Sequence, residues 1–160
     1  MTHACKRQRA GLDRRHVLAG AAGLVLLPVP LSAARATPET MAAAVQDMTG
    51  GTAKITAGRV TIEAPRLAEN GNSVQVIVKA DSPMKQADHV KTITVFSEKN
   101  PIATVARFHL GPRAGVAKVA TSIRLAATQR VLAIATMSDG SHWSGETEVV
   151  VTLAACLDGG

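Results

Sequence analysis

The sequence predicts an all-β protein, an immunoglobulin-like antiparallel β-sandwich of about seven strands with a short N-terminal helix. Three observations support this prediction. Apolar and polar residues alternate with a period of two from about residue 60 onward, as in half-buried strands. Turn-forming residues interrupt these runs at short intervals, and no helical pattern lies between the runs. The length fits one such domain.

Residues 1–36 have the organisation of a signal peptide. A basic cluster precedes an apolar run at 17–27, and a small-x-small sequence follows at 34–36. The run is shorter than the roughly 20 residues that a membrane-spanning helix needs. Arg14 and Arg15 stand just before it, which favours a twin-arginine export signal over an ordinary secretory leader. We therefore expect a periplasmic protein. The leader also holds six of the 18 Lys and Arg residues but one of the 12 acids, so the remaining chain is nearly neutral.

A short amphipathic helix is predicted within residues 37–51. Its start is indicated by an N-cap, a first-turn proline and a first-turn acid, which are Thr37, Pro38 and Glu39. Apolar residues then recur at helical spacing before two glycines stop the run; these are Met41, Val45, Met48, Gly50 and Gly51.

The β-sandwich domain is predicted to span residues 52–153. Its strands are expected at 60–62, 74–78, 93–95 and at about 102–110, 116–125, 130–137 and 146–153. Turn residues separate them at 69–72, 81–83, 100–101, 111–112 and 139–140. The only aromatic residues are Phe96, Phe108 and Trp143, so we expect an aliphatic core.

The familiar catalytic and metal-binding patterns are poorly represented. His89, His109 and His142 are too scattered to indicate a metal site, and we expect neither a metal nor a cofactor. Residues 139–143 place an acid, a hydroxyl and an imidazole side by side. Local adjacency does not make a catalytic triad, because the three groups must form a relay in space. A hairpin turn followed by the start of a strand is the favoured interpretation.

Cys156 is the candidate functional residue. Cys5 would leave with the leader, so Cys156 would be the single thiol of an exported protein. Such a cysteine is either an intermolecular disulfide partner or a working thiol. Burial as a small apolar residue fits poorly, because Asp158, Gly159 and Gly160 are typical of an exposed terminus. From Thr152 to Cys156 an extended chain would reach on the order of 15 Å.

Six segments and the C-terminal cysteine together resemble one known family, the SoxY sulfur carriers of periplasmic thiosulfate oxidation. The segments are LAENGNSVQV at 67–76, ADSPM at 80–84, VKTITVFSEKNP at 90–101, ARFHLGP at 106–112, SIRLAATQRV at 122–131 and ATMSDGSHW at 135–143. The resemblance implies a β-sandwich whose C-terminal cysteine lies in a flexible Gly-Gly-Cys-Gly-Gly arm and carries sulfur as a covalent adduct. Cys156 would then hold the cargo, and the arm would be residues 154–160, with Ala154, Ala155, Leu157, Asp158, Gly159 and Gly160 around the thiol.

The same resemblance implies a set of partners and a non-enzymatic role. A second β-sandwich subunit, SoxZ, would pair with the chain. A cytochrome complex would load thiosulfate, a hydrolase would release sulfate, and a sulfane dehydrogenase would oxidise the remaining sulfur. Neither nucleic acid nor stable membrane insertion is expected. A thiol enzyme such as a peroxidase is disfavoured, because no base or second cysteine accompanies Cys156.

The arm departs from the pattern of the family. Ala154 and Ala155 replace the leading glycines, and Leu157 and Asp158 replace the following ones. Without glycine the backbone loses easy access to positive φ, and Asp158 disfavours the thiolate. Two interpretations remain: a divergent carrier with altered partner enzymes, or an immunoglobulin-like interaction subunit whose carrier role is lost or altered. We favour the divergent carrier, because an idle exported cysteine is an oxidation liability.

Overall fold

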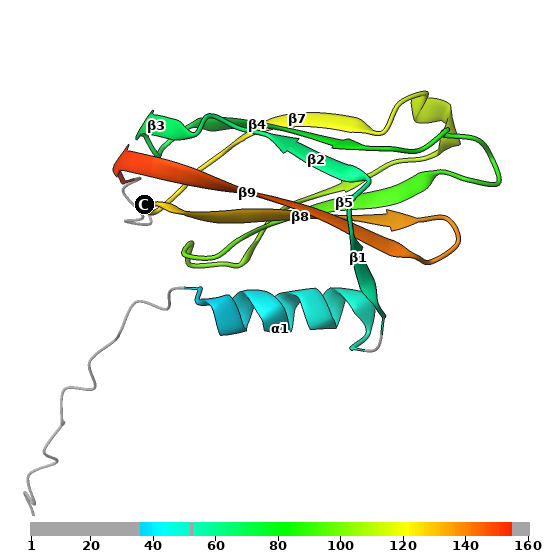
Figure 1. Ribbon diagram of the computed structural model, residues 1–160, viewed down its shortest axis with the longest axis horizontal. Coiled ribbons are helices and arrows are strands. Elements are labelled where there is room, and N and C mark those ends of the chain that lie inside the picture. The colour runs from blue at the N-terminus through cyan, green and yellow to red at the C-terminus, as the bar shows by residue number, and fades with distance from the viewer. Residues whose placement is uncertain (1–35, 52, 155–160) are drawn as a thin grey trace, which may run out of the picture. The chain divides into compact units, whose positions relative to one another are not determined.

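The computed structural model describes residues 36–51 and 53–154 (Figure 1). One helix, nine strands and a 3-10 turn follow one another along this part of the chain. They are α1 (Pro38–Thr49), β1 (Ile55–Ala57), β2 (Val60–Glu63), β3 (Leu67–Asn70), β4 (Val74–Ala80), β5 (Val90–Ser97), β6 (Thr104–His109), η1 (Pro112–Ala114), β7 (Lys118–Ile123), β8 (Gln129–Met137) and β9 (His142–Leu153). The predicted leader and most of the predicted arm, including Cys156, lie outside the described residues.

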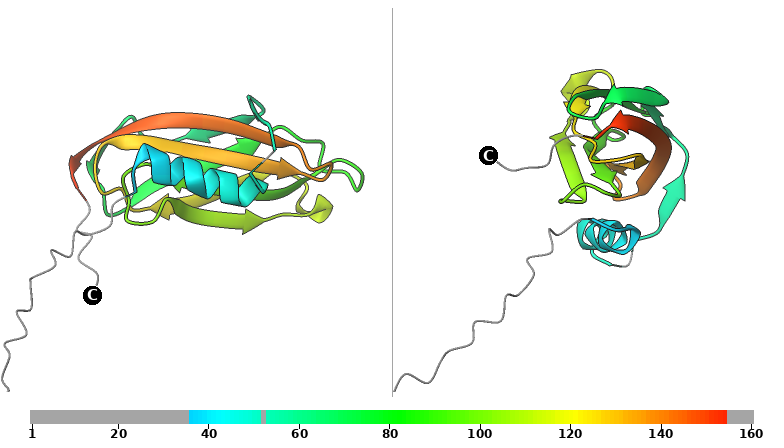
Figure 2. Two further views of the ribbon diagram at one scale, coloured as in Figure 1. Left: turned by 90° about the horizontal axis from the view of Figure 1, so that it is seen from below. Right: turned by 90° about the vertical axis from the view of Figure 1, so that its left-hand side faces the viewer.

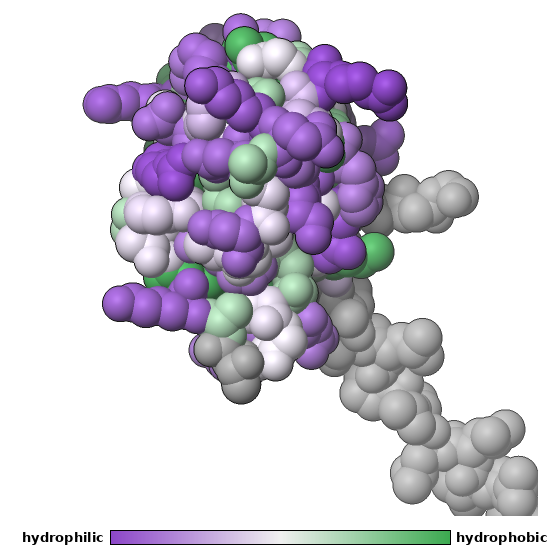
Figure 3. All heavy atoms as spheres, turned by 90° about the vertical axis from the view of Figure 1, so that its right-hand side faces the viewer, coloured by the Kyte–Doolittle hydropathy of each residue, from purple (hydrophilic) through white to green (hydrophobic). Residues whose placement is uncertain are grey.

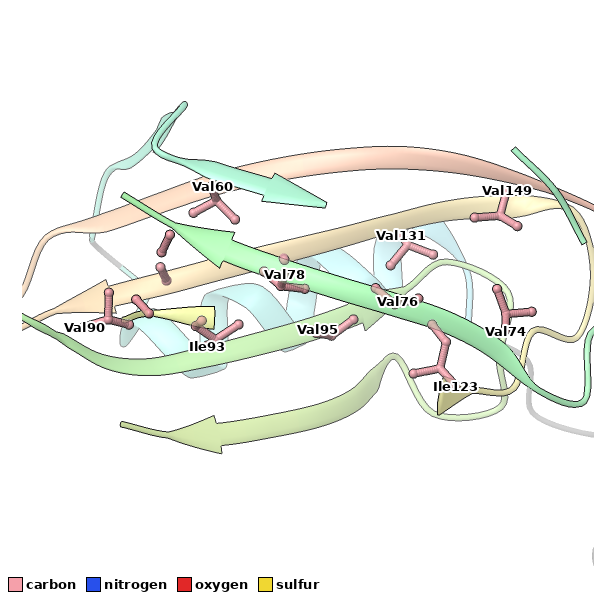
Figure 4. Packing of buried hydrophobic residues seen from close by; sticks show 14 of the residues in the cluster. Val60, Val74, Val76, Val78, Val90, Ile93, Val95, Ile123, Val131 and Val149 are labelled. Atoms are coloured by element: carbon pink, nitrogen blue, oxygen red, sulfur yellow. The ribbon is translucent and has the colours of Figure 1, made fainter. Parts of the chain in front are cut away.

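Two sheets form the sandwich. The larger has six strands in the order β1-β9-β8-β5-β6, with β3 also paired to β9, and the smaller has the order β2-β4-β7. Val74, Val76 and Val78 of β4 alternate with more exposed residues and point into the core. They meet Ile93 and Val95 of β5 from the opposite sheet (Figure 4). The predicted all-β sandwich with an aliphatic core is confirmed.

The prediction was wrong in two details of the sheets. About seven strands were expected, whereas residues 36–51 and 53–154 contain nine, because β1 and β3 are added. Both pair with β9 in parallel, so the sandwich is not wholly antiparallel. These strands have only three and four residues, which is too short to establish a period of two. Asn70 was assigned to a turn but ends β3, where it lies opposite Leu153.

Some strand limits also differ from the prediction. β9 begins at His142 rather than at about 146, because its polar first half pairs with β8 and β1 through the backbone. β6 and β7 are shorter than expected at both ends, since the turn residues around Gly111 and the 3-10 turn separate them. The predicted turn at 139–140 is confirmed.

Helix α1 begins and ends as predicted. The Thr37 hydroxyl accepts a hydrogen bond from the Thr40 amide in a capping box, and Gly50 closes the helix with φ of 70°. Met41 is buried against Phe96 and Ile134 in a second apolar cluster. Phe96 and Ile134 lie on the face of the larger sheet that is turned away from the sandwich core, so α1 covers the outside of that sheet (Figure 2).

The chain passes from the larger sheet to the smaller one between β1 and β2. Gly58 and Arg59 make this step with positive φ values of 109° and 55°. The two sheets come closest where β2 crosses β9. A Cβ atom built on Gly145 would lie 2.1 Å from the carbonyl oxygen of Val60, so only glycine fits at this crossing.

Candidate functional site: the base of the C-terminal arm

Strand β9 carries the chain to the predicted arm. Near its C-terminal end it lies between β8, where Val149 is opposite Gln129, and β3, where Val150 is opposite Leu67. Val149 is buried in the sandwich core. The end of β9 is therefore an inner strand of the sheet, held from both sides.

Hydrogen bonds hold the strand up to its last residue. The Gly71 amide donates to the carbonyl oxygen of Leu153 at 2.8 Å, and the Thr152 hydroxyl donates to the carbonyl oxygen of Glu69 at 3.0 Å. On the other side, the Val151 amide donates to the Thr128 hydroxyl at 2.9 Å. The base of the arm is thus fixed to two neighbouring segments.

The last residue of β9 lies three positions before the candidate thiol in the sequence. Ala154 is exposed and has left the strand, and it is the only residue of the predicted arm that the structure describes. Cys156 is three residues beyond Leu153 in the sequence. Three extended residues span about 10 Å. This reach is shorter than the one expected from Thr152, because the anchoring extends to Leu153.

A groove of about 510 Å³ lies beside the base of the arm. Its lining comes from β8, β9 and the segment after β5, and comprises Glu98, Lys99, Thr128, Gln129, Arg130, Glu146, Thr147 and Glu148. Arg130 pairs with Glu98 at 3.2 Å and with Glu146 at 3.6 Å, and Lys99 donates to the carbonyl oxygen of Thr128 at 2.8 Å. Carboxylates outnumber cations in this lining, so the groove does not favour the binding of an anion.

Apolar side chains are exposed around the base of the arm. Leu67, Val150 and Leu153 are 56%, 43% and 68% exposed. Leu67 and Val150 lie opposite each other on β3 and β9 and share one face of the sheet, whereas Leu153, three residues after Val150, points to the other face. Exposed apolar side chains that gather on one surface are typical of protein contact sites. The surface that surrounds the base of the arm can therefore be contacted by another protein.

Residues 139–143 form a turn and the start of a strand, as predicted, and not a relay. The carboxylate of Asp139 accepts hydrogen bonds from the Ser141 hydroxyl at 2.7 Å and from its amide at 2.8 Å. These bonds hold the pKa of Asp139 below its ordinary value. His142 Nδ1 lies 3.1 Å from the Thr136 hydroxyl instead. Trp143 packs beneath the Arg59 guanidinium, 5.1 Å from the ring centre.

Metal-ligand clusters and membrane-spanning helices are absent from the described part of the chain. Within residues 36–51 and 53–154, no three His, Cys, Asp or Glu side chains are grouped so that they could hold a metal ion. No helix in this part of the chain is long and apolar enough to cross a membrane. The end of the sandwich that carries the β8–β9 turn presents mostly hydrophilic side chains (Figure 3).

The sequence matches the family described as sulfur oxidation protein SoxY over residues 45–156. The chain belongs to the SoxY family. The match includes the anchored strand β9 and ends at Cys156. Among solved structures, the sulfur carrier protein SoxY from Chlorobium limicola f thiosulfatophilum is similar with 27% identity and a TM-score of 0.60, over 72% of this chain and 98% of that chain.

Other solved structures share the fold with less sequence similarity. A putative superoxide reductase from Thermotoga maritima is 20% identical with a TM-score of 0.53, over 64% of this chain and 96% of that chain. A superoxide reductase (neelaredoxin) variant from Ignicoccus hospitalis is 19% identical with a TM-score of 0.52, over 72% and 92%. At this level of identity, the similarity to superoxide reductases shows only that the β-sandwich fold also occurs outside the SoxY family. No curated protein matches the sequence significantly.

The SoxY resemblance predicts Cys156 as the functional thiol, which lies outside the described residues, but it did not indicate the residues that anchor β9. Gly71 and Thr128 hold β9 through contacts with Leu153 and Val151, which are distant in the sequence. The segment that contains Gly71 was assigned to a turn, and nothing in the sequence distinguishes Thr128 from other surface threonines.

Proposed function

We propose that this protein is a periplasmic carrier that holds thiosulfate-derived sulfur covalently on Cys156 and presents it to the Sox enzymes. Membership of the SoxY family supports a sulfur-carrier role in sulfur oxidation. The observation that carries the finer proposal is that the family match runs along the anchored strand β9 and ends at Cys156. The cysteine is thus the last matched residue, three positions beyond the last residue of the strand.

The chemistry requires a thiolate and an electron acceptor. Joining the Cys156 sulfur to thiosulfate forms an S–S bond, releases one proton from the thiol and removes two electrons. The cytochrome complex accepts these electrons. Hydrolysis of the terminal sulfonate then releases sulfate, with water as the oxygen donor, and leaves a persulfide on Cys156. The sulfane dehydrogenase oxidises this remaining sulfur.

The described part of the chain fits a carrier better than an enzyme. The groove beside the base of the arm contains more carboxylates than cations, and its Arg130 is already paired with Glu98 and Glu146. An anionic cargo would be repelled there. The reacting groups are therefore supplied by partner proteins, and this chain supplies the thiol and its anchored base.

Departures in the arm favour a carrier with altered delivery. Ala154, Ala155, Leu157 and Asp158 stand where the family has glycine, and Gly159 and Gly160 come at the very end. A β-carbon at each of the four positions narrows the accessible φ and ψ range. Asp158 adds negative charge two residues from the thiol, which disfavours both the thiolate and an anionic adduct. The partner enzymes must accept a bulkier and more acidic arm.

The proposal includes a partner subunit and an export route. A SoxZ-like β-protein would pair with the chain in the periplasm, after twin-arginine export directed by Arg14 and Arg15. Apart from this subunit, the exposed pair of Leu67 and Val150 supports a contact with a Sox enzyme near the base of the arm.

Intact-mass spectrometry tests the carrier role. Wild type should gain the mass of a thiosulfate-derived adduct when it is incubated with thiosulfate and the loading cytochrome complex. Cys156→Ser should gain none and should abolish thiosulfate-dependent electron output, because a hydroxyl forms no stable bond to sulfane sulfur. Both proteins should unfold at the same urea concentration, since the substitution lies beyond the fixed end of β9.

One alternative is supported by the same arm. The loss of four glycines around Cys156 also fits a SoxY-family interaction subunit that no longer carries sulfur. In that case wild type would not load with its cognate cytochrome complex, although it would still bind its partner subunit. An adduct that persists in Cys156→Ser would contradict the assignment of the site.

A further inference from the structure

Strand β6 leaves one edge of the larger sheet unpaired. It pairs with β5 and, within the described residues, with no other strand. The Leu110 amide donates to the carbonyl oxygen of Lys91 at 2.8 Å. This bond shows which residues of β6 direct their backbone groups toward β5. Because such ladders alternate, the amide and carbonyl groups of Arg107 and His109 point away from β5. Two backbone donors and two acceptors are therefore free to pair with a further strand.

The neighbouring helix does not cover this edge. α1 packs on Phe96 and Ile134, over the middle strands of the sheet, and β6 forms the border of the sheet beyond it (Figure 2). The side chains of Arg107 and His109 are exposed. Arg107 lies opposite Thr94 and His109 opposite Thr92, on the same face of the sheet as α1.

The edge is positively charged. From Pro101 to Ala117, which includes β6 and the turn after it, the sequence contains two Arg residues and no Asp or Glu. Arg107 on β6 and Arg113 in the following turn are exposed, and neither makes a salt bridge within residues 36–51 and 53–154. A charged edge discourages pairing with neutral or like-charged strands. It thereby selects a strand that carries carboxylates.

An apolar contact lies at the start of the same edge. Ile102, two residues before β6, is 72% exposed, more than any other large apolar residue in the described part of the chain. Grooves of about 340 Å³ and 240 Å³ flank it, the first between α1 and this segment and the second beside β6. An exposed apolar residue beside charged side chains is the usual composition of a protein interface.

We propose that β6 binds an acidic edge strand of the partner subunit, which extends the larger sheet by one strand and packs against Ile102. This inference rests on the proposed function, because the partner is the SoxZ-like subunit. A second copy of this chain is a poorer occupant, since a two-fold pairing of β6 would set Arg107 opposite His109 and β6 has no Asp or Glu to pair with Arg107. Carboxylates on the added strand would instead pair with Arg107 and Arg113.

Backbone hydrogen exchange provides the first test, with the full-length complex and with the chain alone. In the free chain, the amides of Arg107 and His109 should exchange rapidly, and those of Ala106 and Phe108 slowly, because only the latter pair with β5. Addition of the purified SoxZ-like subunit should protect Arg107 and His109 selectively. A partner that contacts only side chains would not protect the Arg107 and His109 amides selectively.

Charge reversal provides the second test. Arg107→Glu should weaken binding of the SoxZ-like subunit by about tenfold, and the affinity of wild type should fall with rising salt. Arg66→Glu is the matched control. Arg66 is also exposed, makes no salt bridge within the described residues and undergoes the same change in charge, but it precedes β3 rather than β6. A carboxylate→Lys change on the partner strand should restore the binding of Arg107→Glu.

The outcomes separate this inference from the proposed function. If the subunit binds wild type, and neither the protection pattern nor Arg107→Glu shows an effect, β6 is not the interface, although the carrier proposal stands. If protection of Arg107 and His109 rises with the concentration of the chain alone, the edge pairs with itself and the inference is overturned. If no SoxZ-like subunit binds, both the inference and the proposed partnership fail, while adduct formation on Cys156 still tests the carrier role.

Discussion

Replacement of Gly145 by alanine should destabilise the fold at the point where its two sheets are closest. A Cβ atom at this position would lie 2.1 Å from the carbonyl oxygen and 2.9 Å from the carbonyl carbon of Val60. Real Cβ atoms essentially never approach other atoms within 3.0 Å. Strand β2 or strand β9 would therefore have to move by about 1 Å.

The expected cost follows from which atoms must move. The obstructing atoms belong to the backbone of β2, and the four residues of β2 are paired with β4 from Val60 opposite Ala80 onward. Because this contact is rigid, the steric clash should lower the free energy of unfolding by about 3 kcal/mol, near the upper end of the usual range for overpacking. Alanine recovers about 0.5–1 kcal/mol because glycine is unfavourable within a strand. The net loss is about 2 kcal/mol, or roughly 8 °C in Tm for a domain of this size.

Urea unfolding of the purified protein measures this loss. Trp143 is the only tryptophan, so its fluorescence follows the fold near the substituted position, and far-UV circular dichroism follows the whole sandwich. Gly111→Ala is the matched control, because its φ of −151° suits any residue and no atom lies within 4 Å of its Cβ position. If Gly145→Ala unfolds at the same urea concentration as wild type, the close approach of β2 and β9 is not a rigid feature.

Three further outcomes are expected. Changing Arg14 and Arg15 to Lys should retain the protein in the cytoplasm, whereas unchanged export on cell fractionation would indicate the general secretory route. Asn100→Ala should lower the free energy of unfolding by about 1–3 kcal/mol in urea titrations, because the buried Gln129 amide loses its acceptor at 3.0 Å. Asp139 has a lowered pKa, so it stabilises the folded state above the ordinary carboxylate pKa and this stabilisation is lost as the pH falls through the lowered value. Asp139→Asn should therefore show a smaller loss of stability than wild type between about pH 5 and pH 2 in unfolding experiments at several pH values.

The parts of the fold that bury side chains were predictable from the sequence. Val74, Val76 and Val78 alternate with polar residues because one face of β4 packs in the core, and this periodicity is visible in the sequence. Thr37 and Gly50 similarly mark the ends of α1 through local backbone chemistry. Local signals of this kind depend only on neighbouring residues.

The parts that depend on backbone pairing were not predictable. β1 and β3 are short, and β3 exists because its backbone pairs with the far end of the chain, at Val150 and Leu153. The four residues of β3, LAEN, show no sequence pattern that predicts this pairing, and the polar residues among them suggested a turn. The same holds for the site, where Cys156 stood out as a lone thiol, while the hydrogen bond between Thr128 and Val151 joins residues 23 positions apart.

If Cys156 carries sulfur as proposed, the short sequence between the anchored strand and the thiol limits how the sulfur can be delivered. The Gly71 amide donates to the carbonyl oxygen of Leu153, and two residues, Ala154 and Ala155, separate Leu153 from Cys156, so an extended chain would span about 10 Å from that point. In the proposed carrier, a partner enzyme would therefore have to bring its reacting atoms close to the exposed pair of Leu67 and Val150. The replacement of four glycines would narrow the backbone conformations open to the arm. Recognition of this exposed pair and acceptance of the cargo would then occur in the same encounter, which would make the proposed carrier specific for its enzymes.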